Sequence, residues 1–157
     1  MQNVKYNLCI MQNLKQISWF QDVLEFCRKV PLIIIITVIV SLLAWQNKAL
    51  FNRLIFYPPA VNNGQWDRFV THGFIHADSM QLLFNMFTLY FFGRAIEGLY
   101  QSFLFGYGFV VFYVLAIIVA MIPSSIKNKN NATYLSLGAS GGLSAVLFAF
   151  SLLAPWE

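Results

Sequence analysis

Four long apolar runs separated by polar stretches dominate the pattern of the chain. A helix of about 20 mostly apolar residues crosses the ~30 Å hydrocarbon core of a bilayer. Each of the four runs therefore predicts a membrane-spanning helix, and their approximate limits are Val30–Gln46, Met80–Ile96, Ser102–Ile122 and Ser140 to the end of the chain. Glu157 directly follows Pro155-Trp156, without the hydrophilic flank that usually ends a span, so we expect the chain to be cut short.

The connections between these runs differ in character. The third run ends at about Ile122 and is followed by Pro123 and then the polar segment Ser124–Asn131, which predicts a loop. The first connection, from Asn47 to about Asp78, is long and carries many apolar and aromatic residues around Pro58-Pro59. We therefore expect this connection to lie in the membrane interface and not in water.

The first 29 residues predict an amphipathic helix at the membrane surface. Apolar side chains recur there at near-helical spacing, with polar residues on the rest of the helical wheel: Ile10, Leu14, Ile17, Leu24 and Cys27. This polar region is far longer than the amino-terminal part of a signal peptide, so the first span is expected to be retained. The predicted organisation is a cytoplasmic or interfacial segment, 1–29, followed by a transmembrane domain, 30–157.

Composition sets the fold class as an all-α membrane protein. With 59% hydrophobic and 10% charged residues, the 157-residue chain is too apolar for a soluble domain, and its medium is the lipid bilayer. The net charge of +4 suits anionic lipid headgroups and requires no nucleic acid. Lysines and arginines divide evenly between the two sides, and only Arg28-Lys29 favours a cytoplasmic amino terminus. We expect a multi-pass protein of a bacterial inner membrane.

A serine among glycines marks the place where chemistry is expected. Ser140 stands in Gly138-Ala139-Ser140-Gly141-Gly142 at the start of the fourth apolar run. Glycine allows another backbone to approach closely, so the hydroxyl is accessible at membrane depth. The alternative is packing alone, because Gly141, Ala145 and Ala149 form a stripe of small residues that lets two helices meet.

Polar residues gather at the start of the second apolar run. Gln81 and Asn85 are four residues apart and share one helix face, where they must bond a partner helix or line a wet cavity. His72 and His76 have the same spacing, but Asp67 and Asp78 are the only further ligands nearby, too few for zinc. We predict no metal here and interpret the histidines as groups that hold a loop against the helix ends. No phosphate loop or dinucleotide fingerprint indicates a cofactor.

These residues resemble the rhomboid family of intramembrane serine proteases. Gly138-Ala139-Ser140-Gly141 resembles the G-x-S-G nucleophile motif, and His72, His76 and Asn85 resemble the histidine-rich entry into the second helix. Phe92-Gly93-Arg94-Ala95-Ile96-Glu97 is similar to the G-x-x-x-E end of that helix. Arg68 resembles the arginine of the first loop, with Asp67 interrupting the usual Trp-Arg pair. A simpler interpretation of Glu97 is an exposed pair with Arg94.

The resemblance implies a fold of four transmembrane helices, the first four of a six-helix core. It implies that Ser140 attacks the peptide carbonyl of a transmembrane protein substrate, and that Asn85 and the Ser140 N–H hold the oxyanion. Gln81 stands where the family usually has a second oxyanion residue, a histidine. The family's base is a histidine of the sixth helix, which this chain lacks, so we expect the 157-residue chain to be inactive by itself.

Two other function classes stay open. A pseudoprotease or derlin-like protein would bind transmembrane segments without cutting them, which Gln81 and the missing base favour. A structural membrane protein would need neither Ser140 nor Asn85. Replacing Ser140 with alanine would abolish cleavage by a protease and would leave a binder or scaffold unchanged.

Overall fold

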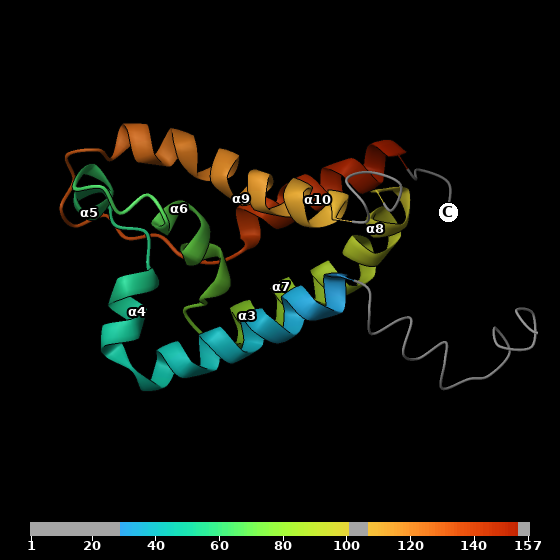
Figure 1. Ribbon diagram of the computed structural model, residues 1–157, viewed down its shortest axis with the longest axis horizontal. Helices are drawn as coiled ribbons and strands as arrows, with labels where there is room; N and C mark the ends of the chain where they lie inside the picture. The colour runs from blue at the N-terminus through green and yellow to red at the C-terminus, as the bar shows by residue number, and fades with distance from the viewer. Residues whose placement is uncertain (1–28, 101–106, 154–157) are drawn as a thin grey trace, which may run out of the picture.

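The computed structural model describes residues 29–100 and 107–153, and the regular structure of this part is helical (Figure 1). An isolated antiparallel bridge joins Phe56 to Ser136. The amphipathic helix expected in residues 1–29 lies outside the described residues except for Lys29. The elements are α3 (Lys29–Gln46), α4 (Lys48–Leu54), α5 (Pro58–Asn62), α6 (Arg68–Thr71), η1 (His72–Phe74), α7 (Ser79–Thr88), η2 (Leu89–Gly93), α8 (Arg94–Tyr100), α9 (Gly108–Lys127) and α10 (Ser140–Leu153).

Two of the four expected spans are single long helices. Within the described residues, α3 and α9 are long and apolar enough to cross a membrane. The apolar helix α10 is shorter over its described length. The second expected span is a succession of three elements, α7, η2 and α8. Length and composition therefore support a membrane protein with two candidate spanning helices.

The second apolar run is continuous but changes its winding halfway. Asp78 caps its start, because the carboxylate accepts the Gln81 N–H at 2.8 Å. The stretch Leu89–Gly93 is a π-helix, a local widening that often marks functional sites in helices. Gly93 ends this stretch at a tight crossing, where an added Cβ would lie 3.3 Å from both Phe109 and Val30. Hydropathy alone predicts a span here but does not predict the change from α-helix to π-helix.

The loop expected to begin at Ser124 begins four residues later. The helix α9 passes through Pro123 and ends at Lys127, so the prediction of a helix end at the proline is wrong. A proline removes one N–H from the helical ladder, and the surrounding bonds can hold the helix together. The end is set instead by Asn128, whose backbone N–H and side-chain Nδ2 both donate to the Ser124 carbonyl, at 3.0 and 2.9 Å.

The core of the bundle is formed by one face of each long element. Its largest fully buried side chains come from α3, η2, α8, α9 and α10: Val30, Leu89, Ile96, Phe109, Tyr113, Ile117 and Val146. The opposite faces are apolar too, and side chains such as Ile36, Phe84, Val119 and Phe148 are exposed. Apolar residues inside and outside suit a helix bundle that lipid surrounds.

The connection Asn47–Asp78 folds into a compact cap at one end of the bundle. It contains α4, α5, α6 and η1. The helix α4 packs against α3, whereas α5 and α6 lie beside α9 (Figure 1). Phe56, Val61 and Met121 form a small apolar cluster that joins the cap to α9. His72 and His76 of this cap contact the backbone directly before α10, at Gly138 and Ala139, so the cap positions the candidate site.

Candidate active site

Ser140 is the first residue of α10, and its side chain is exposed. The turn before it depends on Gly138, whose φ of 102° is in the left-handed region that glycine tolerates. At a helix start the first backbone N–H groups have no partner within the helix. The serine therefore combines an accessible hydroxyl with an N–H that the helix itself does not use.

The segment that leads to Ser140 is extended and held on three successive anchors. Ser136 exchanges two backbone hydrogen bonds with Phe56, at 2.9 and 3.1 Å. The Gly138 N–H donates to the His72 carbonyl at 2.9 Å. The Ala139 N–H faces His76 Nε2 at 3.5 Å, at the long end of hydrogen-bond distances. The backbone before the serine is thus fixed by the cap and by both histidines.

Both histidine rings are buried and bonded within the protein. His72 Nδ1 bonds the Arg68 carbonyl at 2.8 Å, and burial lowers the pKa of this ring. His76 is fully buried and bonds Ser41 of α3 through Nδ1 at 3.1 Å. Burial lowers the pKa of His76 to about 4, although the nearby Asp78 carboxylate acts in the opposite direction. The His76 ring is therefore neutral at physiological pH.

Gln81 presents an amide donor to the serine turn, and Asn85 lies one helical turn further along α7. Gln81 Oε1 accepts the Ala77 N–H at 2.8 Å, which leaves Nε2 facing Gly138. A Cβ added to Gly138 would lie 2.6 Å from that nitrogen. Asn85 Nδ2 is buried and has no hydrogen-bond partner among the described residues. Neither side chain bonds another helix in the described part of the chain, so the alternative of interhelical hydrogen bonding is not what the structure shows.

A cavity of about 170 Å³ adjoins Ser140. Its wall is made by the segment before the serine, the start of α10, the facing side of α9 and one histidine: Ser136, Leu137, Gly138, Ser140, Gly141, Gly142, Ile117, Ala120, Met121 and His72. The exposed hydroxyl and the cavity share a boundary. Ser140 is therefore both exposed and part of the wall of a small cavity between α9 and α10.

The glycines that follow the serine pack α10 closely against α9. A Cβ on Gly141 would lie 2.6 Å from Cβ of Ala120, and one on Gly142 would lie 2.7 Å from the side chain of Ile117. The packing interpretation is therefore confirmed at Gly141, the first residue of the predicted stripe of small residues, and Gly142 adds a second close contact. It does not account for the serine, whose side chain points away from the packed face and is exposed.

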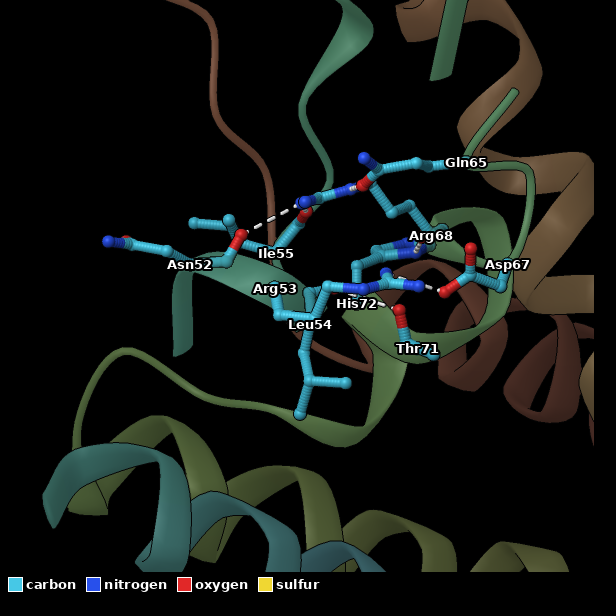
Figure 2. A network of polar contacts seen from close by, with 9 residues as sticks. All are labelled: Asn52, Arg53, Leu54, Ile55, Gln65, Asp67, Arg68, Thr71 and His72. Atoms are coloured by element: carbon cyan, nitrogen blue, oxygen red, sulfur yellow. Dashed lines mark hydrogen bonds and ion pairs between the residues drawn. The ribbon is translucent and has the colours of Figure 1, made fainter. Parts of the chain in front are cut away.

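Arg68 organises the cap, as Figure 2 shows. Its guanidinium is buried and donates to the carbonyls of Asn52, at 2.9 Å, and Ile55. Its Nε donates to Gln65 Oε1 at 2.8 Å. Burial is the main cause of a lowered pKa of Arg68. The three oxygen atoms that accept its hydrogen bonds compensate for the loss of contact with water. The residue matched to the first-loop arginine thus holds the end of α4 to the start of α6.

Asp67, which interrupts the expected Trp-Arg pair, has a partner of its own. Its carboxylate accepts from Arg53 at 2.7 Å, and this hydrogen bond holds the pKa of Asp67 below its usual value (Figure 2). Both side chains are about half exposed, so the pair contributes little to stability. The extra acidic residue is accommodated at the surface of the cap without displacing Arg68.

Glu97 is buried, which corrects the interpretation of an exposed pair with Arg94. Its Oε1 accepts the backbone N–H of Lys29, the first residue of α3, while Oε2 is buried without a partner in the described residues. A carboxylate is stabilised at a helix start by the free N–H groups there. Arg94 itself donates to the hydroxyl of Tyr90 at 2.8 Å. Glu97 therefore joins α8 to α3 at the end of the bundle opposite the cap (Figure 1).

Three residues that support the site were not predicted from the sequence. Ser41 and Trp45 of α3 bond the ring and the carbonyl of His76, at 3.1 and 2.7 Å. Ser136 anchors the segment before the serine. A polar residue inside an apolar span is the one hint that points to Ser41, because such a residue needs a partner.

The hydroxyl of Ser140 makes no side-chain hydrogen bond within the described part of the chain, and the two histidines nearby bond other groups. A family model described as a Rhomboid domain matches residues 63–157, which include the histidines, both amides, Glu97 and Ser140. No curated protein matches the chain by sequence.

Proposed function

Because the chain belongs to the rhomboid family, we propose that it is an intramembrane serine endopeptidase whose nucleophile is Ser140. The observation that carries this proposal is an exposed serine whose preceding turn faces the amide of Gln81, together with an unpaired buried amide at Asn85, one turn along the same helix as Gln81. Asn85 Nδ2 is buried and unpaired, and Gln81 Nε2 faces the turn that leads to Ser140. The proposed substrates are transmembrane proteins in the same bilayer, cut at a peptide bond near the cap.

In the proposed reaction, Ser140 Oγ attacks the scissile carbonyl carbon and loses its proton to a base. The tetrahedral oxyanion accepts hydrogen bonds from the Ser140 N–H, Asn85 Nδ2 and Gln81 Nε2. Collapse expels the amine, which takes a proton from the base, and leaves an acyl group on the serine. Water then attacks the ester and releases the acid.

The unpaired amide of Asn85 is the strongest support for an oxyanion role. A buried N–H group without a hydrogen-bond partner lowers the free energy of unfolding by roughly 1–3 kcal/mol. Such a group is therefore rare in a folded protein unless it has a role in binding or catalysis. A donor that is unpaired in the free enzyme and hydrogen-bonded in the transition state lowers the activation free energy without strengthening the binding of the substrate. The second donor, Gln81, is held in place because its oxygen is fixed by Ala77.

The base is proposed to be a histidine outside these 157 residues. His72 and His76 are the only histidines in the sequence. His72 uses Nδ1 to bond the Arg68 carbonyl within the cap, His76 uses Nδ1 to bond Ser41 of α3, and His76 Nε2 faces the Ala139 N–H. Neither ring bonds Ser140, so the activation of the hydroxyl is assigned to a group that packs against the exposed side of α10.

The finer features of the membrane domain belong to the same proposal. We propose that α7, η2 and α8 together form one span and that α10 forms another, which gives four spans with α3 and α9. The exposed apolar side chains on both elements, such as Phe84 and Phe148, support this arrangement. The bacterial inner membrane stays a prediction that fractionation of cells would test.

Labelling with a fluorophosphonate tests the proposal directly. The protein is made from its complete reading frame, and labelling is compared in wild type, Ser140→Ala and Ser144→Ala. Ser144 is the matched control, because it is an exposed serine one turn along the same helix. We expect Ser140→Ala alone to abolish both labelling and the cleavage of a single-span reporter. Equal cleavage by all three proteins would refute the assignment.

A second candidate is a binding protein that has the fold without the chemistry. The observation that favours it is the absence of any histidine bonded to Ser140 among the described residues. Such a protein would associate with single-span segments in vesicles, and Ser140→Ala would leave that association unchanged. Co-purification of an uncleaved reporter, with no labelling of the wild type, would support this candidate over the protease.

A further inference from the structure

A chain of hydrogen bonds connects the first membrane helix to the backbone beside the nucleophile. Ser41 of α3 donates to the Phe74 carbonyl at 3.1 Å and bonds His76 Nδ1 at 3.1 Å. On the other edge of the ring, His76 Nε2 faces the Ala139 N–H at 3.5 Å. Ser41 and His76 are buried, and Ala139 is buried as well. Water therefore does not compete for these bonds.

The chemistry of the partners determines which ring nitrogen of His76 carries the proton. A backbone N–H can only donate, so Nε2 beside Ala139 must be the acceptor. Nδ1 then carries the hydrogen and donates to Ser41 Oγ, whose own hydrogen is already directed at the Phe74 carbonyl. The opposite tautomer would set two N–H groups against each other at Ala139. Ser41 thus selects the form of the ring that can hold the nucleophile segment.

We propose that His76 is a positioning residue for Ser140, held by Ser41 so that its Nε2 accepts the Ala139 N–H and fixes the backbone directly before the nucleophile. This inference rests on the proposed function of Ser140. Ser41, a residue of the first membrane helix, would thus influence the geometry at Ser140 without contacting it.

The position of the bond explains why it matters. The Gly138 N–H is engaged by the His72 carbonyl, and the Ala139 N–H is engaged by His76. The next N–H along the chain belongs to Ser140 and is one of the free donors of the helix start. With the two preceding N–H groups held by the histidines, the direction of the Ser140 N–H and of its side chain is set before any substrate binds. Catalytic groups need such support to stay within a fraction of an ångström of their working geometry.

The tautomer can be measured without any variant. Protein labelled with [15N]histidine, in lipid nanodiscs at neutral pH, reports by NMR which nitrogen of each ring carries hydrogen. We expect His76 to be protonated at Nδ1 and unprotonated at Nε2. A His76 ring with its hydrogen on Nε2 would overturn the proposal.

Removing the hydroxyl of Ser41 tests the connection at a distance. In Ser41→Ala the ring loses its Nδ1 acceptor, so we expect the amide hydrogen exchange of Ala139 to accelerate at least tenfold. The matched control is Thr37→Val, one turn earlier in α3, because the buried Thr37 hydroxyl bonds only the Ile33 carbonyl of its own helix. Acceleration of less than threefold relative to this control would overturn the proposal.

Variants of the ring itself separate positioning from a loss of folding. His76→Gln keeps an acceptor near the position of Nε2, whereas His76→Met has similar size and no oxygen or nitrogen. In protein made from the complete reading frame, we expect fluorophosphonate labelling of Ser140 to slow at least tenfold in His76→Met and to recover in part in His76→Gln. Equal labelling of His76→Met and wild type would overturn the proposal. If the wild type is not labelled at all, the proposed protease function fails, and the tautomer and exchange measurements still decide the positioning role.

Discussion

Replacing Gly138 with alanine perturbs the site in two ways that the structure separates. The φ of 102° puts the residue in the left-handed region, where a Cβ costs roughly 1–2 kcal/mol. The new Cβ would also lie 2.6 Å from Gln81 Nε2, so the amide must rotate and give up its bond to Ala77. A lost hydrogen bond of this kind costs about 1 kcal/mol. We expect Gly138→Ala to lower the free energy of unfolding by about 2–3 kcal/mol.

Two comparisons separate the conformational term from the contact. Gly64 has a φ of 90° and no atom within 4 Å of an added Cβ, so Gly64→Ala should cost only the conformational term, roughly 1–2 kcal/mol. In a Gln81→Ala background the contact is removed in advance. Gly138→Ala should then cost about 1 kcal/mol less than it does in the wild type.

Reversible denaturation in mixed micelles, followed by circular dichroism, measures these four proteins against the wild type. The reasoning requires a coupling between positions 138 and 81 that is larger than the usual error of additivity, about 0.5 kcal/mol. Equal costs of Gly138→Ala in the presence and absence of Gln81 would show that the amide does not face the turn. The proposed oxyanion role of Gln81 would then lose its geometric basis.

Four further outcomes follow from the contacts described. The pKa of His76 is about 4 in the folded protein and 6.5 for a free ring, so between these pH values the unfolded chain binds a proton that the folded protein does not. The free energy of unfolding should therefore fall by up to about 3 kcal/mol as the pH drops from 6.5 to 4. His76→Gln should remove this part of the pH dependence of denaturation. Arg68→Lys should cost about 1–3 kcal/mol, since an ammonium group lacks the planar fork that reaches three acceptors, and an unchanged melting temperature would contradict this. Glu97→Gln keeps an oxygen for the Lys29 N–H and should change stability by less than about 1 kcal/mol, whereas Glu97→Leu should cost about 1–3 kcal/mol in the same denaturation assay. Asn85→Ala should lower kcat by about 10²–10³ without lowering the melting temperature, because its Nδ2 bonds nothing among the described residues; a loss of stability would instead indicate a structural role.

Local pattern predicted the helices well because their cause is local. Hydropathy and length are properties of consecutive residues, and they located α3 within one residue at both ends, whereas α9 begins six residues and ends five residues after the predicted limits. The beginning of α10 at Ser140 follows from the glycine turn and the polar loop before it. The pattern failed at Pro123, where two local effects oppose each other. Proline disfavours a helix, but the backbone hydrogen bonds on either side of it continue the helix to Lys127, and Asn128 ends it.

The motif residues themselves came from the sequence, but their roles depend on contacts that no spacing reports. Glu97 is buried because the start of α3, 68 positions away in the chain, offers it a free N–H. His76 is neutral because the packing of the cap removes it from water, and its bond to Ser41 spans 35 positions.

The amino-acid sequence by itself thus determined the membrane class, the two long helices and the identity of the serine motif. The tertiary structure decided which polar groups are left without partners at that motif. The physical reason is that an apolar run forms a helix wherever it is, whereas a hydrogen bond between distant segments exists only when packing brings donor and acceptor within about 3 Å. Asn85 shows the difference: its place on the helix was readable from the sequence, but only the packed structure shows that Nδ2 is buried and unpaired.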